Sequence, residues 1–321
     1  MKMQGANRFG CGKLPIRISA LDKCDYDMTL DDCRLFYADE IRIVASLNSS
    51  ALVAAYARVP REKFMGPAPW QVASPAVGFR VLAGEPYSTT GNPRDLYHNV
   101  LVALDPNRHL NNGQPSVLAR WIEALELAPG GRVYHLGCGV GYYTAIMAEV
   151  VGPAGKVVAS EIDSGLAARA RENLATYSNV SVHAEDGAAF DPGECDAILI
   201  NAGVTHPHPL WLKRLSDRGR LVLPFTGTID STGGGAGIVA RITRNGNGFS
   251  TRIVTLAAIY SCTSVRDPEM NVALAKAFGS KALFQLKSIR TDPHEQQDTC
   301  LAHGADICLS TVDLGAQTLQ C

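Results

Sequence analysis

The chain has 321 residues, of which 46% are hydrophobic and 19% charged, so a sizeable core is expected and global disorder is excluded. The formal net charge of −1 shows no basic excess, which argues against nucleic acid as a main partner. No apolar run is long enough to span a bilayer, and the N-terminus lacks a charged-then-apolar signal pattern. We therefore expect a cytoplasmic protein without a membrane partner.

The cysteines are odd in number and scattered, and none forms a C-x-x-C pair. Reduced cytosolic thiols are the simplest interpretation, and no zinc site is expected. A metal at His206-Pro207-His208 would lack a third ligand at recognisable spacing. The nine cysteines are Cys11, Cys24, Cys33, Cys138, Cys195, Cys262, Cys300, Cys308 and Cys321.

The first part of the chain reads as a leader followed by helices and a loop. Residues 1–30 have little periodicity and are expected to form a leader or arm. From Asp31 the apolar residues recur every three or four positions, which predicts a helix capped by Asp31 or Asp32. Further helices are predicted over residues 51–58 and 116–127. The stretch 66–95, rich in Pro, Gly and Ser, predicts a long surface loop, and residues 31–127 together are expected to form an N-terminal helical and loop region.

The stretch from Gly131 to Glu161 predicts a strand–turn–helix–strand unit. An apolar run ends in a glycine turn, a helix-length segment follows, and glycine with proline stops it at Gly152-Pro153. The second strand ends in Glu161, 161 − 141 = 20 residues past the last glycine. Such βαβ units place at that position a carboxylate that binds ribose hydroxyls.

The glycine spacing indicates which nucleoside is bound. The glycines at 137, 139 and 141 read G-x-G-x-G and are followed by the bulky Tyr142, which argues against the pyrophosphate of a dinucleotide. This spacing is typical of methyltransferases that use S-adenosyl-L-methionine (SAM), whereas an ordinary tight turn is the alternative. Cys138 within the turn is expected to be a small residue that fits, not a nucleophile.

Alternating strands and helices continue after Glu161. A helix capped by Asp163 or Ser164 runs to Tyr177, and a strand then ends at Asp186-Gly187. The predicted strands are 180–182, 197–200 and 220–224, a helix lies around 210–215 and stops near residue 219, and a glycine-rich loop covers 227–237. The turn Asn245-Gly246-Asn247-Gly248 predicts a hairpin of 238–243 with 249–256.

These elements predict an α/β fold, a Rossmann-like class I methyltransferase sheet of parallel strands finished by an antiparallel hairpin. It is preceded by an N-terminal helical segment and followed by a C-terminal extension. The SAM-binding domain would cover 128–259 and the extension 260–321, with a helix from Asp267-Pro268 to Gly279 and a strand over 282–289. We find no chemistry in the extension.

Four segments together resemble protein-L-isoaspartate O-methyltransferases. They are Val59–Phe64 (V-P-R-E-x-F), Gly113-Gln114-Pro115 (S-Q-P or S-A-P), His135–Tyr142 (E-x-G-x-G-x-G-Y) and Gly219–Pro224 (G-G-R-L-V-I-P). The resemblance covers roughly residues 32–256. It departs from the family at His135, which replaces an acidic residue, and at Asn111-Asn112-Gly113, which replaces Thr-Ile-Ser.

The resemblance implies SAM as cofactor and a peptide or protein as substrate. Asp186 is expected to bind the adenine amino group. The implied cofactor-binding residues are His135, Gly137, Cys138, Gly139, Gly141, Glu161, Ile162, Asp186, Gly187 and Asn201. The acceptor site is assigned to Asn112, Gly113 and Asn201, and the N-terminal region 31–127 is expected to contribute to it.

The expected reaction is methyl transfer to a carboxylate of an aspartyl or isoaspartyl residue. A carboxylate is ionised at neutral pH and needs no general base. The histidines of the predicted loops, His98, His109, His206 and His208, are interpreted as solvent-contacting residues, although one could act as a base. Two alternatives stay open: a different acceptor, including a small molecule, and a non-catalytic SAM-binding scaffold.

Overall fold

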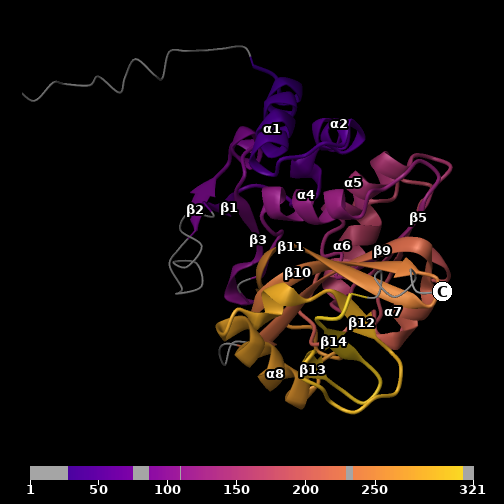
Figure 1. Cartoon of the computed structure of the whole chain (residues 1–321). Helices are drawn as coiled ribbons and strands as arrows, with labels where there is room; N and C mark the ends of the chain where they lie inside the picture. Colours follow the sequence, from indigo (N-terminus) through magenta and orange to yellow (C-terminus); the bar gives the residue numbers. More distant parts are fainter. Residues whose placement is uncertain (1–27, 75–86, 109, 229–233, 314–321) are drawn as a thin grey trace, which may run out of the picture.

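The computed structural model describes residues 28–74, 87–108, 110–228 and 234–313. One mixed sheet organises the molecule, with strand order β13-β14-β12-β11-β10-β9-β8-β5-β6-β7, and Figure 1 shows helices on both of its sides. The predicted leader, residues 1–30, falls almost wholly outside the described residues.

The parallel half of the sheet runs from β9 through β8, β5 and β6 to β7. Its strands are β5 (Arg132–Leu136), β6 (Lys156–Ser160), β7 (Val180–His183), β8 (Cys195–Ile200) and β9 (Leu215–Thr228). The central strand β8 ends in a continuous apolar run that is fully buried, as expected for a parallel strand covered on both faces. This half matches the predicted Rossmann-like sheet.

The antiparallel half begins with the predicted hairpin and then continues beyond it. Strands β10 (Gly234–Asn245) and β11 (Gly248–Tyr260) pair over their whole length. The extension adds β12 (Ser288–Arg290), β14 (Cys308–Ser310) and β13 (Cys300–His303) to the same sheet. The extension therefore enlarges the sheet instead of forming a separate layer.

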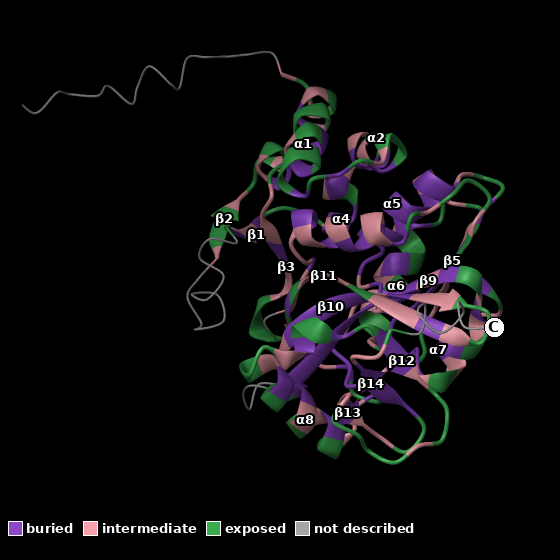
Figure 2. Ribbon diagram, in the orientation of Figure 1, coloured by how far each residue is buried: buried purple, intermediate pink, exposed green. Residues whose placement is uncertain are grey.

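Two apolar clusters cover the two faces of the sheet. One joins the sheet to the N-terminal helices and to α5 and α6, and the other joins it to α7, α8 and the extension. Figure 2 shows strands β9 and β10 mainly in purple, and green residues on the outer helices α1, α2 and α8. The helices are α1 (Leu30–Val44), α2 (Ser50–Arg58), α4 (Pro115–Ala124), α5 (Tyr142–Val151), α6 (Ser164–Asn173), α7 (Pro209–Arg214) and α8 (Pro268–Gly279).

The predicted long loop over 66–95 is wrong for its described residues. Strands β1 (Trp70–Ala73) and β2 (Ser88–Thr90) pair antiparallel there, and β3 (Leu101–Asp105) and β4 (Leu110–Asn111) complete a four-stranded sheet. These strands have only two to five residues, too few for a clear alternation of apolar and polar residues, so their pairing depends on contacts between segments that are distant in sequence.

The cap of the first helix also differs from the prediction. Thr29 is the N-cap, and Asp32 closes a capping box with it through the Thr29 backbone N–H at 2.9 Å. Asp32 therefore occupies the third helical position. Asp163 is confirmed as the cap of α6, where its Oδ1 accepts from the Leu166 N–H at 2.9 Å.

Three further boundaries were misplaced. Helix α6 ends at Asn173 and α4 at Ala124, both short of the predicted ends, whereas β9 begins at Leu215, where the helix was expected to continue. The glycine-rich stretch 227–237 belongs partly to β9 and β10. The strand predicted over 282–289 is mostly a 3₁₀ turn, η6 (Ala282–Gln285), followed by β12.

A buried arginine joins the N-terminal layer to the glycine turn. Arg61 lies in η2 (Arg61–Lys63) with no exposed surface. Its guanidinium donates to the carbonyls of Leu96 (2.7 Å), His98 (3.1 Å) and Val100 (2.8 Å). It also lies 5.8 Å from the ring centroids of Tyr37 and Tyr142, a cation–π distance.

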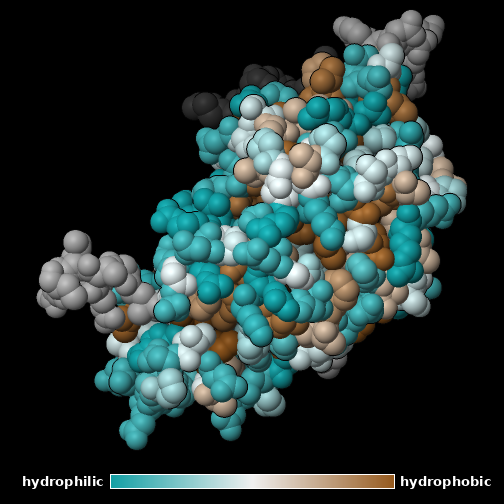
Figure 3. Space-filling model, turned by 90° about the vertical axis from the view of Figure 1, so that its right-hand side faces the viewer, coloured by the Kyte–Doolittle hydropathy of each residue, from teal (hydrophilic) through white to brown (hydrophobic). Residues whose placement is uncertain are grey.

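No helix among the described residues is long and apolar enough to cross a membrane. The face in Figure 3 is mainly hydrophilic, and its brown residues form small groups interrupted by teal ones.

We predict that Arg61→Met lowers the free energy of unfolding by about 3–5 kcal/mol, because three carbonyls would lose their charged donor. Denaturant unfolding measures this loss. Arg58→Met is the matched control: Arg58 is a 59% exposed arginine paired with Glu149, and its replacement should change stability by less than about 0.5 kcal/mol. Equal losses in the two variants would contradict the role given to Arg61.

Candidate functional site

The candidate site lies at the carboxyl end of β5, where the strand order of the sheet reverses direction. Strand β5 pairs with β6 on one side and with β8 on the other, which is the crevice where open α/β sheets bind ligands. Asn201 follows β8, and its Nδ2 donates to the Gly137 carbonyl at 3.3 Å. The structure thus brings Gly137 and Asn201 together, as the sequence predicted.

The glycine turn needs glycine at each of its three positions. Gly137, Gly139 and Gly141 have φ values of +74°, +56° and +89°, a region that other residues rarely adopt. A Cβ on Gly141 would lie 2.7 Å from the Leu174 side chain. A Cβ on Gly139 would meet only Leu104, at 3.9 Å, so the turn is open where a ligand would approach.

Glu161 is held against this turn. Its carboxylate accepts hydrogen bonds from the backbone N–H of Gly139 at 2.8 Å and from that of Asp163 at 3.1 Å. The residue is only 8% exposed, whereas the next residue, Ile162, is 59% exposed. The fixed carboxylate of Glu161 can accept hydrogen bonds from the hydroxyls of a ribose. The exposed side chain of Ile162 beside it can pack against the face of a base.

Asp186 and Gly187 form the neighbouring turn, after β7. Asp186 Oδ1 accepts from the Ala188 N–H at 3.0 Å and from the Ser264 hydroxyl at 2.8 Å. A Cβ on Gly187 would lie 2.3 Å from Leu136, so only glycine allows this turn to pack on β5. Ser264 belongs to the extension, and sequence reasoning missed it.

The extension reaches the site through residues 261–267. Ser261 forms a bridge with Gly203, the Asp267 N–H donates to Thr205 Oγ1 at 2.9 Å, and the Thr205 N–H donates to the Val265 carbonyl at 3.3 Å. The expectation that the extension carries no chemistry overlooked this segment. No motif marks it, because its contacts are made through the backbone and single hydroxyls.

His135 and Cys138 are buried, and neither side chain is available as an ionised group. His135 has no exposed surface, and its Nδ1 lies 2.9 Å from Thr144 Oγ1. Burial lowers the pKa of His135 to about 3, so the ring is neutral at pH 7. Burial raises the pKa of Cys138, which fits a small packing residue better than a nucleophile.

The predicted acceptor loop packs on the start of α5. The Tyr143 hydroxyl donates to the Gly113 carbonyl at 3.2 Å. Gly113 has a φ of +73°, and a Cβ there would lie 2.9 Å from the Leu118 side chain. A serine at this position would be strained. Replacing Gly113 by Ser alone therefore cannot restore the hydroxyl that the family has in its Thr-Ile-Ser segment. Asn112 is 8% exposed, and its Nδ2 is buried without a hydrogen-bond partner among the described residues.

Two loop histidines are described near the strand ends. His208 caps α7, accepting from the Leu210 N–H at 3.3 Å. His206 Nδ1 lies 2.9 Å from Thr205 Oγ1, and burial lowers the pKa of both imidazoles. His98 is exposed, and His109 falls outside the described residues. All four were interpreted as solvent-contacting residues. His206 and His208 are partly exposed, and His208 has in addition a structural role as the cap of α7.

We predict that His135 makes folding stability fall in acid. The unfolded chain binds a proton at this ring below a pKa of about 6.5, whereas the folded ring stays neutral down to about pH 3. Stability contributed by His135 is therefore lost as pH falls from 6.5 towards 3, by up to about 1.4 kcal/mol per pH unit. The free energy of unfolding, measured with denaturant between pH 7 and pH 4, should fall less steeply with decreasing pH in His135→Gln than in the wild type. The exposed control His98→Gln should keep the pH dependence of the wild-type free energy of unfolding. The wild-type pH dependence in His135→Gln would contradict the role given to His135.

Comparison with known proteins agrees with this geometry. The family model described as protein-L-isoaspartate(D-aspartate) O-methyltransferase matches residues 42–248. Among curated relatives, the protein-L-isoaspartate O-methyltransferase of Roseiflexus castenholzii is 37% identical over 49% of this chain and 72% of its own length. That of Photorhabdus laumondii is 30% identical over 65% of this chain and 85% of its own length. The alignment with the Ignicoccus hospitalis protein, at 40% identity, spans only 54% of that protein.

Solved structures show the same fold. A protein-L-isoaspartate O-methyltransferase aligns with a TM-score of 0.52 and 21% identity, over 72% of this chain and 67% of its own. The homologue from Plasmodium falciparum, in complex with S-adenosyl-L-homocysteine, aligns with a TM-score of 0.52 and 16% identity, over 72% of this chain and 98% of its own. The chain belongs to the protein-L-isoaspartate (D-aspartate) O-methyltransferase family, whose members are SAM-dependent methyltransferases of the class I fold.

Proposed function

We propose that this chain transfers the methyl group of SAM to a carboxylate of an aspartyl or isoaspartyl residue in a peptide or protein. The observation that carries the proposal is the carboxylate of Glu161, held by the Gly139 N–H at the point where the sheet order diverges. Relatives named protein-L-isoaspartate O-methyltransferase support the same reaction.

The residues present fit the cofactor. The open backbone at Gly139 leaves room for the methionine part, the Glu161 carboxylate suits two ribose hydroxyls, and the exposed Ile162 suits the adenine face. Asp186 stands at the adjacent strand end, where it can accept from the adenine amino group. SAM supplies an activated methyl group, and the protein supplies its position.

The acceptor chemistry requires orientation more than proton transfer. A carboxylate is already ionised at neutral pH, so the protein has to hold its oxygen in line with the methyl–sulfonium bond. The side-chain Nδ2 of Asn112 is buried and has no hydrogen-bond partner among the described residues. It is a donor suited to bind an oxygen of the carboxylate that receives the methyl group. Together with Gly113 and Asn201 it is proposed to frame the acceptor. We assign residues 31–127 to this acceptor side and 128–259 to cofactor binding.

The proposed location is the cytoplasm. All six cysteines within the described part of the chain are free, as is usual in a reducing compartment.

Replacing Glu161 by Gln should weaken binding of S-adenosyl-L-homocysteine by about 10- to 150-fold, because the ribose hydroxyls lose a charged acceptor. Titration calorimetry measures the affinity. Glu172→Gln is the matched control, since Glu172 is exposed on α6, and it should bind like the wild type. Wild-type affinity in Glu161→Gln would remove Glu161 from the cofactor site.

The acceptor is tested with an isoaspartyl peptide, its aspartyl twin and labelled SAM. We expect a base-labile methyl ester on at least one peptide.

His206→Ala should retain most of the activity, because no general base is needed. Label on the isoaspartyl peptide alone supports a repair enzyme, and label on the aspartyl twin supports a modifying enzyme. A base-stable product would overturn carboxylate methylation, and cofactor binding without transfer to any acceptor in a cell extract would favour a scaffold.

A further inference from the structure

Four potential metal ligands meet in the C-terminal extension, outside the residues that the family model matches. Each of them offers one ligand atom, and these atoms all lie within 4.8 Å of one another. They are His294, Cys300, His303 and Cys308. The expectation of no metal site rested on the lack of C-x-x-C pairs, and this set is instead spaced H-x₅-C-x₂-H-x₄-C.

The strand pairing explains how three of the side chains share one face. His303 on β13 is the direct partner of Cys308 on β14. Cys300 precedes His303 by three residues, so in a regular strand the two side chains would point to opposite faces. The register shifts between Cys300 and Ala302, and such a bulge turns Cys300 to the face of His303 and Cys308.

The fourth side chain comes from the loop before β13 and is held in the tautomer that a metal needs. His294 Nδ1 lies 2.8 Å from the Asp292 carbonyl, which can only accept, so Nδ1 carries the proton. The Nε2 atom of the neutral ring then bears the lone pair, and it faces Cys300 Sγ at 3.7 Å. Metal-bound histidines are oriented in this way by the hydrogen bond of their other nitrogen.

Two further contacts are suited to a metal-bound state. The Gln297 N–H donates to Cys300 Sγ at 3.3 Å, as expected around a thiolate. His303 Nδ1 is buried without a hydrogen-bond partner among the described residues. An unpaired buried nitrogen is costly, and a bond to a cation would satisfy it.

We propose that these four residues bind a structural zinc ion. Two thiolates and two imidazoles form a tetrahedral set typical of zinc, and together they balance its charge. Zinc–ligand bond lengths imply ligand separations of roughly 3.3–3.8 Å, so the cluster needs to contract by about 1 Å. Since the protein supplies all four ligands, the ion is structural and not catalytic.

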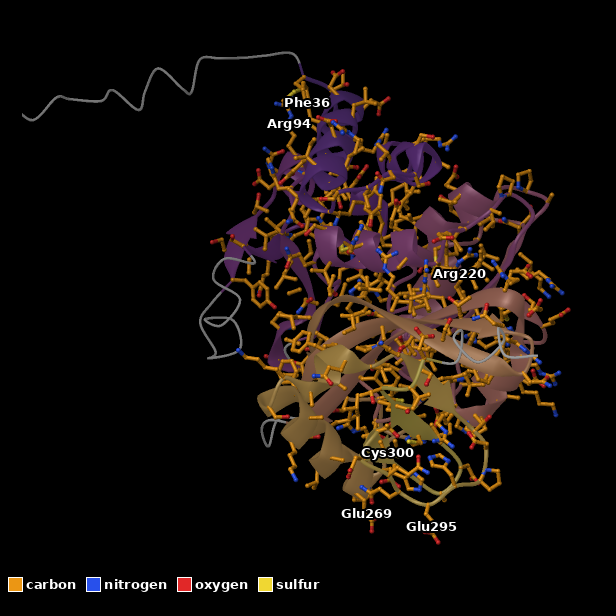
Figure 4. All side chains as sticks on the ribbon, in the orientation of Figure 1. Phe36, Arg94, Arg220, Glu269, Glu295 and Cys300 are labelled. Atoms are coloured by element: carbon orange, nitrogen blue, oxygen red, sulfur yellow. The ribbon has the colours of Figure 1, made fainter. Side chains whose placement is uncertain are left out.

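The ion would stabilise the edge of the sheet. Strand β12 pairs with β11 through only two residue pairs, and the loop over 291–299 is mostly exposed. Figure 4 shows Cys300 inward of Glu269 and Glu295, whose side chains point away from the body of the molecule. Zinc would tie the exposed loop to β13 and β14, whose residues Ala302 and Leu309 belong to the buried core.

The test is the metal content of the full-length protein, purified under reducing conditions and measured by mass spectrometry. We expect about one zinc per chain in the wild type, and a loss of about fivefold or more in Cys300→Ser and in His303→Ala. Cys33→Ser, which changes a buried cysteine of α1, is the matched control and should keep its zinc. Cooperative unfolding of each variant confirms that it is folded.

A second measurement does not depend on any variant. Chelation of the wild type should lower its melting temperature, and titration of the chelated protein with Co²⁺ should give the intense absorption of a tetrahedral site with thiolate charge transfer. Wild-type protein that contains no zinc and binds neither Zn²⁺ nor Co²⁺ at micromolar concentration would overturn the proposal. So would a Cys300–Cys308 disulfide that persists under reducing conditions, or zinc retained in both Cys300→Ser and His303→Ala.

Discussion

The buried guanidinium of Arg61 is the interaction on which the geometry of the site depends. Burying an arginine is costly unless its donors are satisfied. Here three carbonyls of the 96–100 turn accept from the two terminal nitrogens of Arg61, and its Nε has no partner among the described residues. The same group lies over the ring of Tyr142, the residue that follows the glycine turn. One side chain therefore fixes the N-terminal layer against the first turn of α5. The V-P-R-E-x-F segment has a structural explanation, because only a long planar cation reaches all of these partners.

With that layer in place, side-chain contacts hold the proposed cofactor side and the proposed acceptor side next to each other. Tyr143 binds the Gly113 carbonyl, and the ion pair of Arg108 with Asp163, at 2.7 Å, ties the loop after β3 to the start of α6. The cap bond to Leu166 and then this arginine lower the pKa of Asp163. The acceptor loop departs from the rest of the family at Gly113, because a serine would be strained at its positive φ. The loop offers the buried amide of Asn112 instead.

The C-terminal extension is part of the same architecture. Its first residues run along the strand ends, where Ser264 binds Asp186, and its last strands lengthen the sheet. The proposed zinc ion would anchor these outer strands at the far edge. The segment that reaches the proposed cofactor site would then be held at both ends, by the sheet through β11 and by the proposed metal cluster beyond α8.

Local chemistry in the sequence was sufficient to predict the parallel sheet, the glycine turn and the place of Glu161, Asp186 and Asn201. Those predictions follow from short-range rules: a glycine spacing, apolar runs, and the rule that ligands bind at the carboxyl ends of parallel strands. Tertiary structure decided three other features: the pairing of β1 with β2, the burial of His135 and the hydrogen bond of Ser264 with Asp186. Each depends on contacts between segments distant in sequence, and no local pattern marks the partners. The metal cluster is the clearest case. A bulge in β13 decides that Cys300 and His303 share a face, and no spacing rule contains a bulge.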